Sequence, residues 1–557
     1  MSQNNAFSGR VSNHFSMIPS VDIERSAMNR DHGEKTAFDS GYLVPIFIDE
    51  VLPGDTFTLG LSSFVRMSNP PVVPFMDNLW LDTFFFFVPN RLVWQHWENF
   101  NGAQDTLNQS TDYLIPTVSS GSSGFAVGSL ADYFGLPTGV SNLSINALPF
   151  RAYNLIFNEW FRDENLVNPS TENFGDGPDN LDSYVLRKRA KRHDYFTSAL
   201  PWPQKGPGVE ISIGGSANVT LSGGSTPSYT GSITTYLDNG TSRALQAYAD
   251  LTRIEASDGS TDVYRQGLGN FSTSMTLGQS RNASLPFTIP SLQVSGITGT
   301  ADLSNATPIS INDLRQAFQI QRLYERDARG GTRYAEILRA HFSVVSPDAR
   351  LQRPEYLGGN SVRIHVNTVV QTSSTDSVSA QGNVSAYVTG GDVSPGFSKS
   401  FVEHGYIIGL ANVRADLNYQ QGINRMWSRR GRFDFYWPVL AHLGEQAILN
   451  KEIYAQGTDV DDQVFGYQER YAEYRYKPSM ITGKMRSTDP QSLDVWHLAQ
   501  EFSSLPTLNS DFIDENPPLD RVLSVTDEPQ FLADFWFDLR TVRPMPVYSV
   551  PGMVDHF

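Results

Sequence analysis

The sequence predicts a mainly β protein, a β-sandwich with long loops that carry a few short helices. Aromatic residues make up 12% of the 557 residues and charged residues only 18%, and the chain has 44 Gly and 32 Pro. This composition suits strands joined by long ordered loops rather than a helical bundle. Strand-like segments occur near both ends of the chain, and one of them, Leu81–Val88 (LDTFFFFV), carries Phe on both of its faces.

The net charge and the absence of cysteine further restrict the class of protein and the kinds of site that it can have. The formal charge is −17 and there are no cysteines, which excludes disulfides and thiolate metal sites. No signal peptide is visible, and no run approaches the roughly 18 apolar residues of a spanning helix. We expect a soluble protein made in the cytosol. An acidic chain argues against free nucleic acid as the partner of its whole surface, although a local basic face remains compatible with it.

Residues 1–40 are polar, irregular and mildly basic, with Arg10, Arg25 and Arg30. Two interpretations stay open for this segment. It is either a disordered tail or an arm that becomes ordered only against a neighbouring subunit or a nucleic acid.

Strand patterns begin at Tyr42, and the turn Pro53-Gly54-Asp55 separates two β segments. In the next strand, Leu81–Val88, alternate residues point to opposite sides, so both faces must be covered by other protein. A Ser- and Gly-rich loop over 103–147 follows. Then Pro149 begins a helix whose apolar residues recur at helical spacing: Phe150, Tyr153, Phe157, Trp160 and Phe161.

Residues 209–305 form a large insertion of Ser, Thr, Gly and Asn with few charges, which we expect to be a surface-exposed, mostly β or irregular subdomain. Ser310 and Asp313 then have capping-box spacing for a helix that Gly330-Gly331 ends. A second helix is expected over Tyr334–Phe342. Alternating patterns at 362–366 and over Phe531–Arg540 predict two further strands.

The sequence holds no specific enzyme signature. The ten His are scattered and more typical of structural positions than of metal ligands. Glu159, Asp163 and Glu164 lie together near the end of the first helix, where ion pairs with Arg are a commoner role than catalysis. The basic run Arg187–Arg192 has two interpretations: it forms ion pairs with acidic loops of the protein, or it contacts phosphates of a nucleic acid.

Several long blocks resemble the major capsid proteins of the Microviridae, in particular the gokushovirus branch. These blocks cover most of the chain outside 209–305: Asp49–Phe57, Met76–Trp97, Asp132–Val140, Arg151–Leu166, Lys191–Pro207, Gly331–Phe342, Ser346–Gly359, Asn424–Gly457 and Val464–Gly483.

The resemblance implies a single viral jelly roll of eight antiparallel strands with large loop insertions. The jelly-roll core would comprise 41–208 and 306–557, with 1–40 as an arm. It implies a structural protein without catalytic activity and without a cofactor, in a T=1 icosahedral shell around circular single-stranded DNA. The insertion 209–305 would form protrusions at the threefold axes and contact a bacterial receptor. Expected partners are further copies of the chain, a small basic DNA-packaging protein, a pilot protein and a scaffolding protein.

Two sets of site residues follow from this resemblance. We expect a DNA-facing set in the basic run and the arm: Arg187, Lys188, Arg189, Lys191, Arg192 and Arg10. We expect Phe84, Phe86, Trp94 and Trp97 to contact a neighbouring subunit, unless a long loop of the same chain covers the strand. The alternative function is a secreted β-sandwich that binds carbohydrate or acts as a glycosidase, although such a protein would need the signal peptide that is not visible.

Overall fold

The computed structural model of the chain describes residues 23–209, 311–375, 377 and 380–548, and between them five short strands. These strands are β8 (Val219–Ser222), β9 (Ile233–Tyr236), β10 (Ser242–Ala247), β11 (Ile254–Ala256) and β12 (Thr298–Ala301). The chain divides into two compact units, one of Met1–Gly208 with Gln321–Phe557 and one of Val209–Ile320.

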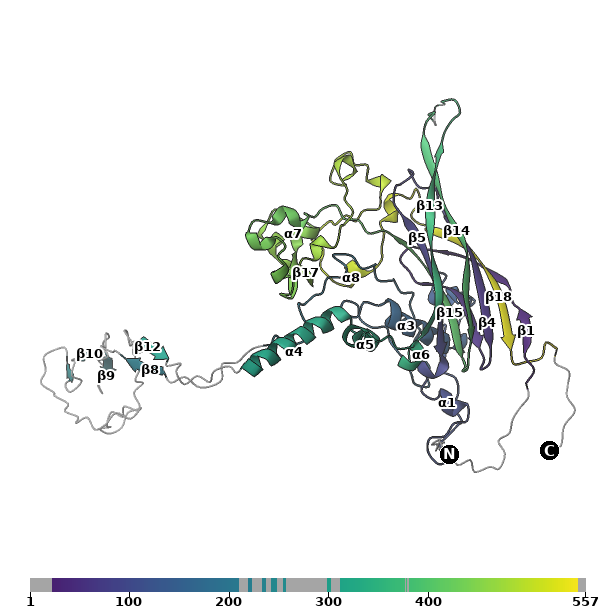
Figure 1. Ribbon diagram of the computed structural model, residues 1–557, viewed down its shortest axis with the longest axis horizontal. Coiled ribbons are helices and arrows are strands. Elements are labelled where there is room, and N and C mark those ends of the chain that lie inside the picture. Colours follow the sequence, from purple (N-terminus) through teal and green to yellow (C-terminus); the bar gives the residue numbers. More distant parts are fainter. Residues whose placement is uncertain are drawn as a thin grey trace, which may run out of the picture. The chain divides into compact units, whose positions relative to one another are not determined.

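The first unit is built on one antiparallel sheet (Figure 1). Its strands are β1 (Ser26–Asn29), β2 (His32–Phe38), β3 (Val44–Val51), β4 (Thr56–Met67), β5 (Leu79–Pro89), β13 (Glu355–Val370), β14 (Val384–Ser400), β15 (Gly405–Ala415) and β18 (Phe531–Arg543). The order across the sheet is β1-β18-β4-β14-β13-β5-β15-β3, and β2 also pairs with β18. The turn Pro53-Gly54-Asp55 lies between β3 and β4, as the sequence predicts.

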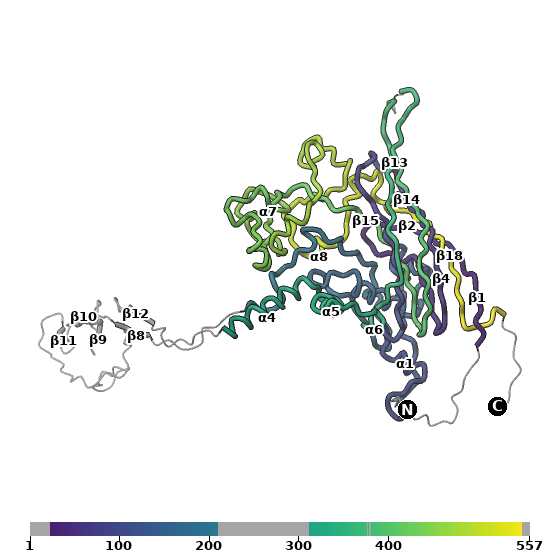
Figure 2. Tube along the Cα trace, in the orientation of Figure 1, coloured from purple at the N-terminus to yellow at the C-terminus, as the bar shows by residue number. Residues whose placement is uncertain are grey.

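This order is that of a jelly roll. One half is β2-β18-β4-β14 and the other is β13-β5-β15-β3, and the pairing of β13 with β14 joins them. β1 and β2 pair with successive parts of β18, so together they act as one edge strand. Counted in this way the sheet has eight strands, which confirms the fold that the resemblance implies. In Figures 1 and 2, β13 and β14 run beyond the other strands.

The inward faces of the two halves share one hydrophobic core. On β18, Phe531, Phe535 and Phe537 are fully buried while Asp534 and Asp538 are exposed, as their alternation predicts. From the opposite half, Phe47 of β3 approaches Phe537 with a ring-centroid distance of 5.2 Å. Aromatic side chains from strands far apart in the sequence therefore fill the space between the two halves of the jelly roll.

The second half of the predicted N-terminal arm belongs to this sheet. The expectation of irregular structure is wrong for residues 26–29 and 32–38, which form β1 and β2 along β18. These are edge strands with one half-exposed face, so their backbone pairing needs no strong apolar alternation in the sequence. Residues 1–22, including Arg10, lie outside the described residues.

The helices are short apart from α4. They are α1 (Trp97–Phe100), α2 (Leu130–Tyr133), α3 (Leu148–Ile156), α4 (Ile311–Gly330), α5 (Tyr334–Phe342), α6 (Asp348–Leu351), α7 (Asn450–Ile453) and α8 (Ser510–Ile513). Pro149 lies in the first turn of α3, and a π-helical turn, Phe157–Phe161, continues that helix. The predicted ends of α4 at Gly330 and of α5 are confirmed. Across the described residues, no helix has the length and apolar character needed to cross a bilayer.

Short strand pairs lie in the loops of the first unit. β6 (Thr117–Ser119) pairs with β7 (Ser144–Asn146), and β16 (Glu445–Leu449) pairs with β17 (Val464–Glu469). The predicted Ser- and Gly-rich loop over 103–147 therefore contains a small β ribbon and the helix α2. In the second unit, β8 pairs with β12, and β9, β10 and β11 form a three-stranded sheet.

Residues 90–208, which follow β5, cover one outer face of the jelly roll. A second long connection joins β15 to β18, and its residues Leu498, Leu519 and Val522 pack into the core between the two halves. The helix α3 contacts both β5 and β15, and it lies beside β15 in Figure 1. Side chains of α3, including Phe150, Tyr153 and Ile156, pack with the outward residues of β5 and β15 in a second hydrophobic core. The Phe-rich strand β5 is thus covered on both faces, as its sequence predicts.

Candidate assembly and nucleic-acid surfaces

The basic run Arg187–Arg192 passes between two other segments of the chain. The backbone N–H of Leu43 donates to the carbonyl of Arg187, and Arg189 N–H donates to the carbonyl of Gly41, each over 2.8 Å. On the other side, Lys191 N–H donates to the carbonyl of Ile513 over 2.7 Å. Gly41 has φ +82°, and a Cβ there would lie 2.1 Å from a backbone oxygen of Glu515. The run is therefore packed tightly between these segments.

Arg189 is bound to a buried carboxylate of the same chain. Its Nη1 lies 2.6 Å from Oδ2 of Asp82, which is only 2% exposed on β5. Arg414 Nε donates to the same oxygen over 2.9 Å, and Ser361 also donates to Asp82. Burial by itself raises the pKa of Asp82, but the Ser361 hydrogen bond and the two guanidiniums outweigh it and leave the pKa below its ordinary value. Arg189 thus neutralises an internal charge.

Lys191 also faces inward. It is 6% exposed, its Nζ donates to the carbonyl of Phe512 over 2.7 Å, and it lies 4.9 Å from the centre of the Phe512 ring. Burial lowers its pKa. A lysine in this position holds α8 against the basic run and has little surface to offer to a phosphate.

Three members of the run remain. Lys188 Nζ donates to Asn516 over 3.0 Å and lies above the Tyr42 ring, and the Arg187 guanidinium lies 5.8 Å from the ring of Phe157. Arg192 differs, because its side chain is 57% exposed and its nearest acidic oxygen, on Asp82, is 3.8 Å away. Of the five predicted DNA-facing residues in the run, Arg192 is the one with an exposed side chain.

The side chain of Arg192 lines a cleft of about 1000 Å³. The cleft lies between the basic run, the π-helical turn after α3, the start of α5 and β17. Its lining includes several arginines, and besides Arg189 two of them pair with acidic residues. Arg333 forms an ion pair with Glu164, and Arg329 lies 3.3 Å from Glu469.

Two of the three carboxylates predicted to cluster at the end of the first helix are engaged within the subunit. Glu164 pairs with Arg333, and Asp163 Oδ1 accepts hydrogen bonds from the N–H groups of Asn165 and Leu166 over 2.9 and 3.0 Å. Glu164 and Asp163 thus hold the chain together after the helix. Within the described part of the chain, no group of His, Cys, Asp and Glu side chains is placed to hold a metal ion.

The predicted subunit-contact residues lie largely inside their own chain. Phe86 and Trp94 are 1% and 0% exposed, and Phe84 and Trp97 are half-buried. Phe86 packs against Trp160 at a centroid distance of 5.4 Å, and Trp94 Nε1 donates to Asp176 over 2.8 Å. Phe86 and Trp94 thus have no surface left for a neighbour, because the connection after β5 already covers that face. Only the exposed edges of Phe84 and Trp97 remain open to such a role.

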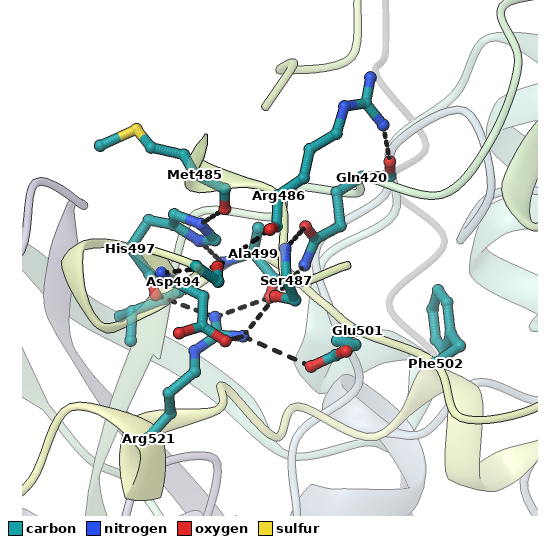
Figure 3. Close-up of polar contacts among 12 residues, drawn as sticks. Gln420, Met485, Arg486, Ser487, Asp494, His497, Ala499, Glu501, Phe502 and Arg521 are labelled. Atoms are coloured by element: carbon teal, nitrogen blue, oxygen red, sulfur yellow. Dashed lines mark hydrogen bonds and ion pairs between the residues drawn. The ribbon is translucent and has the colours of Figure 1, made fainter. Parts of the chain in front are cut away.

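A polar cluster around Arg521 fixes the second long connection (Figure 3). The Nη2 of Arg521 donates to the carbonyls of His497 and Ala499, each over 2.9 Å, and Asp494 and Glu501 lie 3.9 and 4.0 Å from its Nη1. Burial lowers the pKa of Arg521, while these carboxylates oppose that effect. The cluster joins the short helical turn Leu519–Arg521 to the loop that precedes it.

An exposed surface of a different kind occurs at Asn424–Leu443, which we name the arginine–aromatic segment. All ten residues from Arg430 to Val439 are exposed, although five of the ten are aromatic or aliphatic. In the sequence, this segment is part of the block Asn424–Gly457, which resembles the Microviridae capsid proteins. Its run of Arg and aromatic residues with a single Asp was the available signal, but a local pattern does not tell whether such residues lie inside or outside.

Comparisons with known proteins give one answer for the whole chain. Residues 16–553 match the family described as "Capsid protein (F protein)". The chain is 50% identical over 547 residues to the capsid protein VP1 of Bdellovibrio phage phiMH2K, covering 98% of each. It is 46% identical over 592 residues to VP1 of Chlamydia phage 1, covering 98% of each, and 38% identical over 558 residues to VP1 of Spiroplasma virus 4, covering 97% of each.

These relatives are structural proteins of virions, which implies a structural rather than an enzymatic role and gives no support to the alternative of a carbohydrate-binding protein or glycosidase. The jelly-roll sheet and the full-length matches agree on one identity. The chain belongs to the capsid protein (F protein) family and is a major capsid protein of the gokushovirus branch of the Microviridae.

Proposed function

We propose that the chain assembles with copies of itself into a small T=1 icosahedral shell that encloses a circular single-stranded DNA genome. The observation that carries this proposal is that a chain with a jelly-roll sheet matches the phage capsid protein family over residues 16–553. Assembly would take place in the cytoplasm of a bacterial host, and the mature protein would reside in the virion. The shell itself would have no catalytic activity.

The net charge of the chain indicates that it needs a basic partner to package DNA. A chain with a net charge of −17 cannot neutralise a packaged genome, and most cations of the basic run are engaged inside the subunit. A separate small basic protein would therefore carry much of the positive charge that condensed DNA requires. We further propose a scaffolding protein and a pilot protein as partners.

We also propose that Arg192 contacts the genome at the mouth of the cleft. Its exposed guanidinium supports this role, and the aromatic and Arg residues that line the cleft fit a single strand with its bases and phosphates. Arg10, in the segment before the described residues, remains a second proposed contact. Arg187 and Lys188 are half-buried and would contribute less.

The insertion 209–305 would be displayed outside the shell, at the threefold axes, and bind a receptor on the host surface. Its composition supports exposure, because it is rich in Ser, Thr, Gly and Asn and carries few charges. Residues of this kind suit a surface whose loops change between hosts.

Electron microscopy of the chain expressed together with its phage partners tests the central proposal. Closed particles of uniform size, with the chain as the main protein, are the expected result. Chains that stay monomeric under all assembly conditions would contradict it. A glycan-hydrolysis assay on the same particles should give no activity above buffer.

A further inference from the structure

We infer that the arginine–aromatic segment, Asn424–Leu443, is a contact surface for a second copy of this chain in the shell. The inference rests on the proposed self-assembly and assigns one of its interfaces. None of the site residues predicted from the sequence belongs to this segment.

The first argument is exposure. Trp427, Phe433 and Val439 are 75%, 67% and 87% exposed, and Phe435, Tyr436 and Trp437 are exposed as well. Tyr474, which lies next to Tyr436 with a centroid distance of 6.1 Å, is 50% exposed and extends the same surface. Large contiguous apolar patches are rare on proteins that act alone and mark sites of association.

The second argument is that the backbone of the segment is held in place from within. Asp434 accepts from the N–H groups of Arg430 and Gly431 over 2.8 and 2.7 Å. Tyr471 Oη donates to the carbonyl of Phe435 over 3.0 Å, and Trp437 Nε1 donates to the carbonyl of Arg432 over 3.0 Å. A segment that is fixed before it meets its partner loses less conformational entropy on binding.

The third argument is composition. The twenty residues include four Arg and five aromatic residues, one Asp and neither Lys nor Glu. Enrichment in aromatic residues, Met and Arg with depletion of Lys, Glu and Asp is the signature of the buried centre of a protein interface. The four Arg and one Asp leave an excess of three positive charges, which the ion pairs of Arg425 with Glu452 and of Arg429 with Glu473 reduce to one. The whole chain carries −17, so this positive balance favours the approach of another copy.

Single-stranded DNA is the other class of partner that aromatic and Arg residues can suit, and the contacts favour it less. Arg425 lies 2.9 Å from Glu452, Arg429 lies 3.0 Å from Glu473, and Arg432 lies 4.7 Å from the Trp437 ring centre. Three of the four guanidiniums are thus already engaged within the subunit, whereas binding to a strand depends on cations free to neutralise phosphates. The exposed aliphatic side chains of Val439 and Leu443 offer nothing to stack on a base.

A triple variant tests the assignment in the full-length chain, expressed with the other phage proteins. Trp427→Ser, Phe433→Ser and Val439→Ser remove exposed apolar groups and should leave the melting temperature of the free subunit unchanged. The matched control combines Leu107→Ser, Leu114→Ser and Val402→Ser, whose parent side chains are 93%, 83% and 86% exposed. We expect the yield of closed particles to fall roughly tenfold or more in the first variant, the factor set by about 1.4 kcal/mol of lost contact energy, and to stay near the parent level in the control.

The outcomes separate this inference from the proposed function. If the parent chain forms no particles, the proposed self-assembly falls and the inference with it. If the parent forms particles and the triple variant forms as many, only the inference is overturned. An equal loss of particles in the control, or a lowered melting temperature in the triple variant, would also overturn the assignment to this segment.

A photo-cross-linking amino acid at position 433 identifies the partner inside assembled particles. We expect a covalent dimer of the chain on illumination, with the second attachment point mapped to another copy by peptide analysis. Cross-links to the packaged DNA, to a different phage protein or to nothing would each overturn the inference.

Discussion

Asp82 is the residue that determines how the basic run is used. It lies on β5, is almost completely buried, and receives Arg189 and Arg414 as partners. A buried carboxylate without such partners would be strongly destabilising. The cations near it in space therefore serve first to stabilise the fold, and only Arg192, at 3.8 Å and with an exposed side chain, has charge available for a ligand.

This division of roles predicts different phenotypes for two neighbouring arginines. Arg189→Gln should lower the free energy of unfolding by about 1–3 kcal/mol, because Asp82 then keeps Arg414 and Ser361 as its close partners. Arg192→Gln should change stability by less than about 0.5 kcal/mol and lower the DNA retained in purified shells as salt rises. Urea unfolding of the subunit and the ratio of absorbance at 260 and 280 nm across a salt series provide the measurements. Unchanged DNA retention in Arg192→Gln would remove that residue from the genome contact.

Glu34 on β2 predicts a pH dependence of stability. Burial raises its pKa from 4.5 to about 8. The folded subunit therefore holds this proton more tightly than the unfolded chain does between these two values. The contribution of Glu34 to stability is complete below pH 4.5, is lost as the pH rises to 8, and then stays constant.

Glu34→Gln should remove this loss and raise the free energy of unfolding by about 1–2 kcal/mol above pH 8, a value reduced for the partial exposure of the side chain. Below pH 4.5 the variant and the parent should be equally stable. Melting temperatures of the free subunit at pH 4 and pH 9 check this. The exposed Glu528→Gln serves as the control and should shift neither temperature.

At the scale of elements, local sequence patterns predicted those strands and helices that have one clear buried face. The alternation over Phe531–Arg540 and the spacing from Pro149 were sufficient, because burial on one side repeats with the period of the element. β1 and β2 were missed because their stability comes from backbone pairing with β18, about 500 residues away. The burial of Lys191 was missed for a related reason, since its partner Phe512 is 321 residues away.

The double-sided strand β5 shows the limit of such reasoning. The sequence predicted that both faces are covered, but it did not distinguish a loop of the same chain from a neighbouring subunit. In the structure, the residues of α3 and the turn after it fill that place. A resemblance supplied the topology of the sheet, while the identity of the covering segment required the three-dimensional packing.

The polar cluster at Arg521 predicts a stability effect at the level of the second long connection. Arg521→Met should lower the free energy of unfolding by about 2–4 kcal/mol, because the carbonyls of the buried His497 and Ala499 lose their donor. Arg521→Lys should cost less, since one ammonium can still reach one of these oxygens. Urea unfolding followed by Trp fluorescence gives the comparison. The exposed Lys484→Met is the matched control, with an expected change within about 0.5 kcal/mol.

At the scale of the whole molecule, the described ends of the second unit suggest a clean deletion. β8 and β12 pair antiparallel, with Ser222 opposite Thr298. A two-residue Asn-Gly turn can join strands in such a register, so residues 223–297 can be replaced by Asn-Gly without opening the remaining chain. We expect particles of normal yield and stability that no longer adsorb to the host.

Adsorption is measured as the loss of free particles from a suspension of host cells, and particle yield by electron microscopy. Normal adsorption of the shortened particles would contradict a role of the insertion in attachment. Loss of particles altogether would instead show that the insertion contributes to assembly.

The position of β18 has a consequence for the order of events during synthesis. This strand lies between β4 and the edge formed by β1 and β2, and it comes almost last in the chain. From the end of β2 at residue 38 to the start of β18 at 531 are 493 residues, which translation at about 5–20 residues per second covers in roughly 25–100 s. During that time β2 lacks its neighbour in the sheet, and β4 can pair on one side only, with β14. An unfinished chain on the ribosome thus lacks the full sheet, and only finished subunits are competent to join a shell. A chain truncated after residue 530 should accordingly be recovered in aggregates or bound to chaperones, never in particles.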